Sequence, residues 1–207
     1  MPTRGEEEAL PPPPADLSSR ALPLVEENGP WTRMHSVKHD PVYFGRTGLG
    51  RFDDPKGEYG VLYVAGDAFG AFVESFGRTP GRNLVSLDAL RRRHLSTVES
   101  RRPLRLVDLT GSGLARIGAT AAISTDDYEK AQAWSRTLHD HPEAPDGLRY
   151  RLKHDPSKVG VAIFGWVGAG VVSAQAIGTL VASDRRKLLA AILKEYGFGL
   201  VGGPYVA

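Results

Sequence analysis

Arg51, Tyr63 and Glu74 bring a permanent cation, an aromatic ring and a carboxylate together within residues 46–74 of the chain. This stretch begins with a loop rich in arginine and glycine, continues through an apolar run and ends in a segment with helical periodicity. If the apolar run packs against that segment, the three side chains can meet in one cleft. Such a cleft suits a nucleotide, because a guanidinium forms charged, bidentate hydrogen bonds with phosphate oxygens.

Hydrophobic patterning indicates the elements that would hold these residues. The run YGVLYVA around Tyr63 is apolar and aromatic, and it predicts the clearest strand of the chain. The next segment, DAFGAFVESFG, predicts a short helix with Asp67 as its N-cap and Gly77 near its end. Glu74 lies beside the apolar stripe of that helix, where a solvated surface carboxylate is the alternative to a functional one.

A further arginine, Arg33, falls in a strand predicted for residues 31–37. Strand side chains alternate between two faces, so Arg33 and His35 point the same way. An ordinary surface charge is the alternative interpretation of Arg33. The glycines of the following loop, GRTGLGR, would let the backbone approach a phosphate.

The rest of the chain mixes helices and strands without strict alternation. We expect helices over SLDALRRRHL, TDDYEKAQAWSRTLHDH and DRRKLLAAILKEYG. The expected strands are STVES, LRLVDL, GLRYRLKHD, GVAIFGWV and QAIGTLVA. This mixture predicts the α+β class, with one domain in which helices pack on a mixed or antiparallel sheet.

Length and composition limit the alternatives. With 207 residues and 41% hydrophobic content, the chain can form one sizeable core, which we expect in residues 29–207. Residues 1–28 contain GEEE and PPPP, so we expect a flexible arm there. The chain has no cysteine, which excludes disulfides and thiolate chemistry. It also lacks an apolar run of the roughly 18 residues that span a bilayer, so we expect a cytoplasmic protein without membrane contact.

Three other kinds of site receive little support. The loop GRTGLGR lacks the Gly-Lys-Ser/Thr of a Walker loop, and TGSGLARIGA has Arg116 where the dinucleotide fingerprint requires glycine. His139 and His141 lack the spacing of metal ligands, so we expect a frayed, solvated helix end there and no metal. The arginine runs are not interleaved with aromatic residues and the net charge is only +2, so we expect no direct nucleic-acid binding.

Several segments together resemble one family, the RES domain, which is the toxin half of bacterial RES–Xre toxin–antitoxin pairs. The resemblance rests on Arg33 in the first strand, GRFDDP, YGVLYVA, AFVES, DGLRYRLKHD, VAIFG and the closing DRRKLLAAILKEYG, which span about residues 30–201. It implies a fold like that of ADP-ribosyltransferases and NAD as the substrate. The family splits NAD to nicotinamide and an ADP-ribosyl product, or transfers that group to an acceptor, in some members inorganic phosphate.

The resemblance also implies roles for single residues. The family is named after an arginine, a glutamate and a serine, and Arg51 and Glu74 match the first two. Arg33 and Arg51 would hold the diphosphate of NAD, and Tyr63 would line the nicotinamide pocket. Glu74 would hold the ribose hydroxyls and stabilise the positive charge that develops on the ribose.

The serine position of the family falls on Leu152, whose side chain neither donates nor accepts a hydrogen bond. Ser157 substitutes for it only if the register of this strand shifts. Two functions therefore stay open. One is a toxin that degrades NAD and is neutralised by a cognate Xre-type helix-turn-helix antitoxin, often within an oligomer. The other is a catalytically impaired RES-like module that binds a nucleotide or a partner protein.

Overall fold

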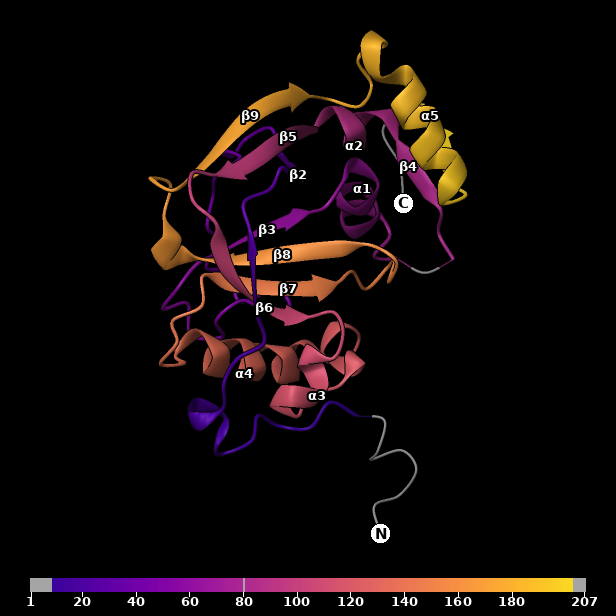
Figure 1. Ribbon diagram of the computed structural model, residues 1–207. Helices are drawn as coiled ribbons and strands as arrows, with labels where there is room; N and C mark the ends of the chain where they lie inside the picture. The colour runs from indigo at the N-terminus through magenta and orange to yellow at the C-terminus, as the bar shows by residue number, and fades with distance from the viewer. Residues whose placement is uncertain (1–8, 80, 203–207) are drawn as a thin grey trace.

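The computed structural model describes residues 9–79 and 81–202 (Figure 1). Its centre is a sheet of eight strands in the order β1-β6-β7-β8-β3-β2-β5-β9. Strands β6 and β7 of this sheet run parallel, and its other neighbouring pairs are antiparallel. A second, two-stranded parallel sheet joins β4 to β10. This arrangement confirms the α+β class with a mixed sheet.

The strands are β1 Leu24–Glu27, β2 Trp31–Ser36, β3 Val61–Ala65, β4 Leu84–Ser86, β5 Arg93–Ser100, β6 Leu104–Leu109, β7 Gly147–Arg151, β8 Val159–Phe164, β9 Val172–Gly178 and β10 Gly199–Val201. The α-helices are α1 Ala68–Phe76, α2 Leu87–Arg91, α3 Gly113–Ile117, α4 Tyr128–His139 and α5 Arg186–Glu195. In Figure 1, α3 and α4 lie beside the β6 side of the sheet, whereas α1 lies next to β2 and β3. Among the described residues, no helix is long and apolar enough to cross a membrane.

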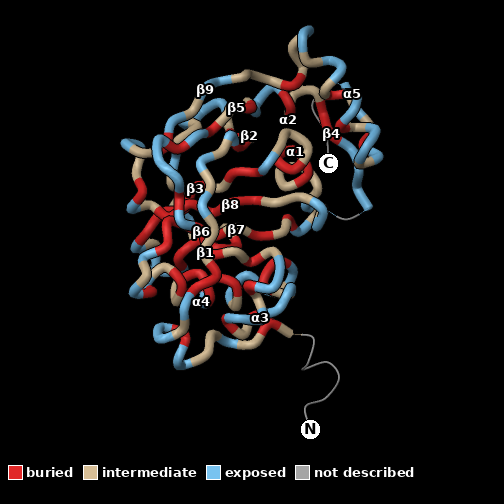
Figure 2. The backbone as a smooth tube through the Cα atoms, viewed as in Figure 1, coloured by how far each residue is buried: buried red, intermediate tan, exposed pale blue. Residues whose placement is uncertain are grey.

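Both faces of the central strand β3 are buried, which explains its unbroken apolar sequence. Val61 and Ala65 belong to the core that includes helix α1, whereas Leu62 and Val64 belong to a second core on the opposite face. Figure 2 shows the same concentration of buried residues in the middle strands. A strand covered on both faces needs apolar residues at successive positions, so it does not alternate.

The structure corrects the expectation of a flexible arm for residues 9–28. Leu10, Leu17 and Leu22 of this segment are all buried, and Leu17 is 0% exposed. Strand β1 then pairs with β6 at the edge of the large sheet. The segment orders because its few leucines reach the main core, so their burial offsets the entropy lost by the backbone. Residues 1–8 of the expected arm lie outside the described residues.

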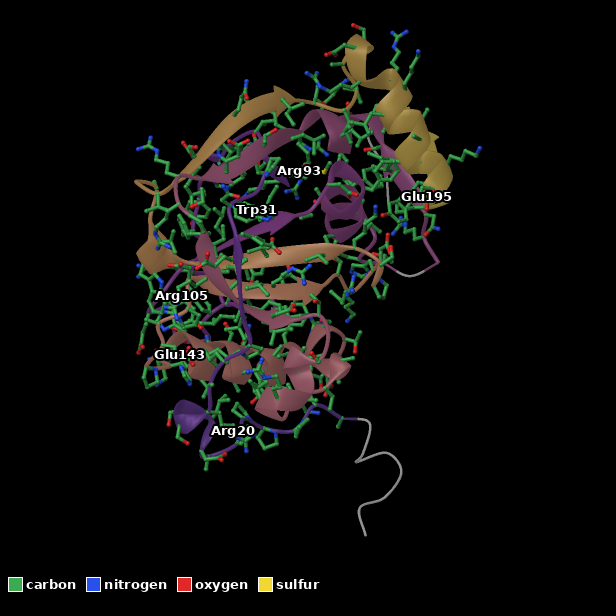
Figure 3. The ribbon with its side chains drawn as sticks, viewed as in Figure 1. Arg20, Trp31, Arg93, Arg105, Glu143 and Glu195 are labelled. Atoms are coloured by element: carbon green, nitrogen blue, oxygen red, sulfur yellow. The ribbon has the colours of Figure 1, made fainter. Side chains whose placement is uncertain are left out.

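Hydrogen bonds also attach this N-terminal segment to the body of the domain. The indole Nε1 of Trp134 donates to the carbonyl oxygen of Pro11 at 2.7 Å, and the backbone N–H of Leu22 donates to Glu143 Oε1 at 2.7 Å. Glu143 also lies beside Arg105, with 3.8 Å between their charged groups (Figure 3). The segment from Leu10 onward is therefore part of the fold.

Two local expectations are wrong. The helix expected over SLDALRRRHL is shorter than predicted, because α2 ends at Arg91, Arg92 is its C-cap and Arg93 begins strand β5. His139 is not a frayed, solvated residue: its ring stacks on Tyr59 with 3.7 Å between ring centroids and 7° between planes. His141 is buried as well, at 5% exposure. Both histidines have packing functions that spacing along the sequence did not reveal.

Candidate functional site

One cavity gathers the four predicted site residues. Its volume is about 190 Å³, and its walls come from β2, β3, β7, α1, the arginine loop before β3, the start of α4 and the segments after α1 and β7. Arg33, Arg51, Tyr63 and Glu74 all line it. The other lining residues are Thr32, Met34, Leu49, Gly50, Val64, Ala65, Ala71, Ser75, Arg78, Tyr128, Tyr150, Leu152, Lys153 and His154. The side chains expected in one cleft thus do line one cavity.

Glu74 is supplied by α1, which begins and ends where the sequence indicates. The carboxylate of Asp67 caps the helix by accepting a backbone hydrogen bond at 2.8 Å, and Gly77 follows the last helical residue. Glu74 is half-buried, and its Oε1 accepts from the backbone N–H of His154 at 3.2 Å. Within the described residues, no hydrogen bond or ion pair engages Oε2. This second oxygen is available to a ligand.

Arg51 is buried, with 7% of its surface exposed, and it serves the fold as well as the cavity. Its Nη1 donates to the carbonyl oxygen of Asp126 at 2.7 Å and to that of Ile123 at 3.4 Å. The ring of Tyr128 covers the guanidinium, with 4.5 Å from Cζ to the ring centroid. The buried Nη2 has no hydrogen-bond partner among the described residues. Arg51 therefore ties its loop to the start of α4 and keeps one donor group unused.

Tyr63 and Asp53 hold the arginine loop in place. The Tyr63 hydroxyl donates to Asp53 Oδ1 at 2.9 Å and accepts from the backbone N–H of Phe52 at 2.9 Å. Gly50 packs so closely here that a Cβ would lie 2.5 Å from Asp53 Oδ1 and 2.6 Å from the Tyr63 hydroxyl. Burial and the neighbouring Asp53 carboxylate raise the pKa of Tyr63 well above its ordinary value. The neutral hydroxyl is thus committed to the loop, while the ring lines the cavity.

Arg33 lies at the cavity in β2, between Thr32 and Met34, which line it as well. Its Nη1 donates to the carbonyl oxygen of Tyr43 at 3.2 Å. Burial lowers the pKa of Arg33 to about 10, against the opposing effect of Asp40. The guanidinium is still charged near pH 7. Because Arg78 and Lys153 also line the cavity, its walls are predominantly positive.

Leu152 lies directly after β7 and is 1% exposed. Its backbone N–H donates to the carbonyl oxygen of Lys158 at 3.1 Å, which continues the pairing of β7 with β8. Ser157 lies in the intervening turn, where its exposed hydroxyl donates to Asp155 Oδ1 at 2.6 Å, and it does not line the cavity. A shift of register that would bring Ser157 to the position of Leu152 is therefore not observed.

Sequence reasoning missed two aromatic residues of the cavity wall. The sequence did indicate Tyr150, because it stands two positions before Leu152 in the expected strand GLRYRLKHD and so faces the same side. Nothing in the sequence indicated Tyr128, because it contacts Arg51 only through the packing of α4 against the arginine loop. Among the described residues, no group of three or more His, Asp or Glu side chains is arranged to hold a metal ion.

Fold and cavity together define the class of protein: an α+β domain whose mixed sheet and first helix enclose a cavity lined by arginines and one glutamate. The sequence matches the RES domain over residues 29–183, and the chain belongs to this family. Among solved structures, its fold is similar to a chain of the M. tuberculosis MbcT–MbcA toxin–antitoxin complex. The TM-score is 0.59 at 19% identity, over 84% of this chain and 94% of that chain. No curated protein matches the sequence.

Proposed function

We propose that this chain is the toxin of a toxin–antitoxin pair and that it degrades NAD by cleaving the bond between nicotinamide and ribose. The observation that carries the proposal is the charge of the cavity, where Glu74 is the one carboxylate among the described lining residues beside four cationic side chains. Those cations are Arg33, Arg51, Arg78 and Lys153. A concave site with a positive net charge attracts a ligand with several negative charges. Membership of the RES domain family supports NAD as that ligand.

The size of the cavity suggests which part of NAD it takes. Its volume of about 190 Å³ is below the roughly 300–1,000 Å³ of pockets that enclose whole drug-sized ligands. The cavity therefore suits the nicotinamide and its ribose, while the diphosphate and the adenosine extend across the rim. Arg78 is exposed at this rim, where it can reach a phosphate without losing its hydration.

The proposed reaction breaks the glycosidic bond of a cationic leaving group. The bond's electron pair leaves with the nicotinamide nitrogen, which becomes neutral, and positive charge develops on the ribose. Oε2 of Glu74 accepts from a ribose hydroxyl and its charge stabilises that transition state, as carboxylates do in glycoside hydrolysis. An oxygen of the acceptor, which is water, phosphate or a protein side chain, then bonds to the ribose carbon. A protonated acceptor loses its proton in this step.

Arg33 and the unused Nη2 of Arg51 would hold the diphosphate in this scheme. Both guanidinium groups are fixed by carbonyl oxygens of the protein, so little side-chain freedom is lost when a ligand binds. The ring of Tyr128 covers Arg51, and it must turn aside before Nη2 can reach a phosphate. We include this movement of Tyr128 in the proposal.

An antitoxin partner fits the rim of the cavity. Leu49 and Tyr128 both line the cavity, and they are 77% and 42% exposed. A protein that covers the opening of the cavity would contact both of these side chains. The proposed partner is an Xre-type helix-turn-helix antitoxin, which would block the entry of NAD.

Incubation of the purified chain with NAD and phosphate, with nicotinamide release as the readout, tests this function. We expect release by the wild type and a loss of at least about 100-fold in Glu74→Gln. Glutamine keeps an oxygen for the His154 N–H, so this variant should remain folded. Glu99→Gln is the matched control, because Glu99 is exposed on β5 and does not line the cavity.

Calorimetry with NAD separates the two functions that the sequence left open. Binding without nicotinamide release would favour the catalytically impaired module. The feature that supports this alternative is Leu152, which stands at the serine position of the family. Absence of both binding and release would overturn the proposed function.

A further inference from the structure

Leu152 fills its part of the cavity wall with methyl groups instead of a hydroxyl. Its Cδ1 lies 2.8 Å from the position that a Cβ on Gly70 would take, and its Cδ2 lies 2.6 Å from the corresponding position on Gly160. The leucine is therefore accommodated by two glycines, one on α1 and one on β8. No hydrogen bond to a ligand can come from its side chain.

A second side chain reaches the same point of the wall. Tyr150 lies opposite Gly160 in the pairing of β7 with β8, and its ring crosses over this glycine. The Tyr150 hydroxyl lies 3.0 Å from the Cβ position on Gly160, while Cδ2 of Leu152 lies 2.6 Å from that same position. The phenol oxygen and the leucine methyl group are therefore neighbours. A hydroxyl is thus present beside the position where Leu152 lacks one.

The surroundings of Tyr150 keep this hydroxyl in place. The residue is 7% exposed, and its ring packs edge-on against Phe52 with 4.7 Å between centroids. Burial raises the pKa of Tyr150 above its ordinary value, the Glu74 carboxylate raises it further and Arg51 opposes both. The phenol is therefore protonated at neutral pH and can donate a hydrogen bond. Within the described residues, no hydrogen bond engages it.

A donor that is positioned, neutral and unpaired at a cavity wall is suited to an oxygen of a ligand, because a phenol hydroxyl donates a hydrogen bond to any acceptor oxygen that comes within reach. We infer that Tyr150 is a further substrate-binding residue, whose phenol donates a hydrogen bond to the ribose that Glu74 holds and so provides the contact that Leu152 cannot make. This inference rests on the proposed function, since it takes a nicotinamide nucleotide as the ligand. It adds a residue that the arginine, glutamate and serine of the family name do not include.

The substitution Tyr150→Phe tests the inference. Phenylalanine keeps the ring against Phe52 and over Gly160 and removes only the oxygen, so the variant should remain folded. We expect kcat/KM for nicotinamide release to fall about 10- to 100-fold and the Kd for NAD from calorimetry to rise about 10-fold. Tyr43→Phe is the matched control, because Tyr43 is 47% exposed and does not line the cavity.

A double variant distinguishes a substrate contact from a structural effect. In the background of Tyr150→Phe, Leu152→Ser restores a hydroxyl beside the lost one, so we expect it to recover at least half of the loss in kcat/KM on a logarithmic scale. A loss caused by disturbed packing would not be recovered by a smaller residue at position 152. Failure of this recovery in a double variant that is still folded by circular dichroism would contradict the inference.

The outcomes separate the inference from the proposed function. Wild-type release of nicotinamide together with unchanged kcat/KM and Kd in Tyr150→Phe overturns the role of Tyr150 and leaves the proposed function standing. If the wild type binds NAD without releasing nicotinamide, the role of Tyr150 is tested by the Kd for NAD. An equal Kd for the wild type and Tyr150→Phe overturns the inference. If the wild type does not bind NAD, both are overturned.

Discussion

The hydroxyl of Tyr63 donates a hydrogen bond to Asp53 Oδ1 at 2.9 Å, which joins the central strand β3 to the arginine loop. The same oxygen accepts from the backbone N–H of Phe52, the residue next to Arg51. A side chain that we expected to line a nicotinamide pocket thus has a second function, because it fixes the backbone that presents Arg51. The position of Arg51 depends on Tyr63.

Tyr63→Phe should destabilise the protein while leaving the ring in the cavity wall. The variant removes a donor from Asp53, which is 3% exposed, so a buried carboxylate loses a hydrogen bond. We expect the free energy of unfolding to fall by about 1.5–3 kcal/mol, measured by urea denaturation. Tyr43→Phe serves again as the exposed control and should change it by less than about 0.5 kcal/mol. Equal urea midpoints for wild type and Tyr63→Phe would contradict the stabilising role of this bond.

Arg51→Lys should loosen the start of α4 although it conserves the charge. An ammonium lacks the planar, forked donors by which Arg51 reaches two carbonyl oxygens and lies under the ring of Tyr128. We expect a loss of about 1–3 kcal/mol in stability and faster amide hydrogen exchange in residues 123–128. Arg116→Lys, at an exposed position of α3, is the control. Unchanged exchange in residues 123–128 would show that the lysine maintains these contacts.

Asp146 should make stability depend on pH in the acid range. Burial of Asp146 disfavours its charge, but hydrogen bonds from Arg102 at 2.7 Å and from the backbone N–H of Arg105 at 2.9 Å outweigh burial and lower its pKa. A lowered pKa in the folded state means that the carboxylate stabilises the fold above the pKa of the unfolded chain, about 3.9, and that this contribution is lost as pH falls further through the folded value. Asp146→Asn should therefore be less stable than the wild type at pH 7.

The difference between Asp146→Asn and the wild type should shrink below about pH 4, because the unfolded chain then takes up a proton at Asp146 before the folded protein does. Thermal unfolding followed by circular dichroism, at pH values from about 2.5 to about 7, measures how the stability difference between the two proteins depends on pH. Asp184→Asn, whose aspartate is exposed, should follow the wild-type curve. If the stability difference between wild type and Asp146→Asn stays constant with pH, the effect of Asp146 comes from packing and not from its charge.

Local pattern was sufficient for the elements that carry most of the site. Strand β3 could be predicted because burial on both faces leaves an apolar run between glycines, and α1 because Asp67 and Gly77 mark its two ends. The four candidate residues lie in or near these elements, and the family resemblance selected them from other charged and aromatic residues. Their presence in one cavity follows from the packing of α1 on β2 and β3.

Contacts between distant parts of the chain were not predictable in the same way. Arg51 and Asp126 are 75 residues apart, and nothing in either local sequence indicates that a loop arginine donates to that carbonyl oxygen. Tyr150 could be placed on the face of Leu152 by alternation, but its approach to that residue over Gly160 depends on the register of β7 with β8. Composition alone was misleading for residues 9–28, because the average content of a segment does not show that its three leucines are each buried in the core.

Leu17→Ala tests whether that N-terminal segment belongs to the folded domain. Leu17 is 0% exposed and packs in the main core, and its carbonyl oxygen accepts a hydrogen bond from His141 Nε2 at 3.1 Å. Truncation of a buried leucine removes apolar contacts and leaves a cavity, so we expect a loss of about 2–5 kcal/mol in the free energy of unfolding. Val37→Ala, at a side chain that is 43% exposed, should cost less than about 0.5 kcal/mol. In a flexible arm the two substitutions would have equally small effects, and urea denaturation of both variants decides between an arm and a packed segment.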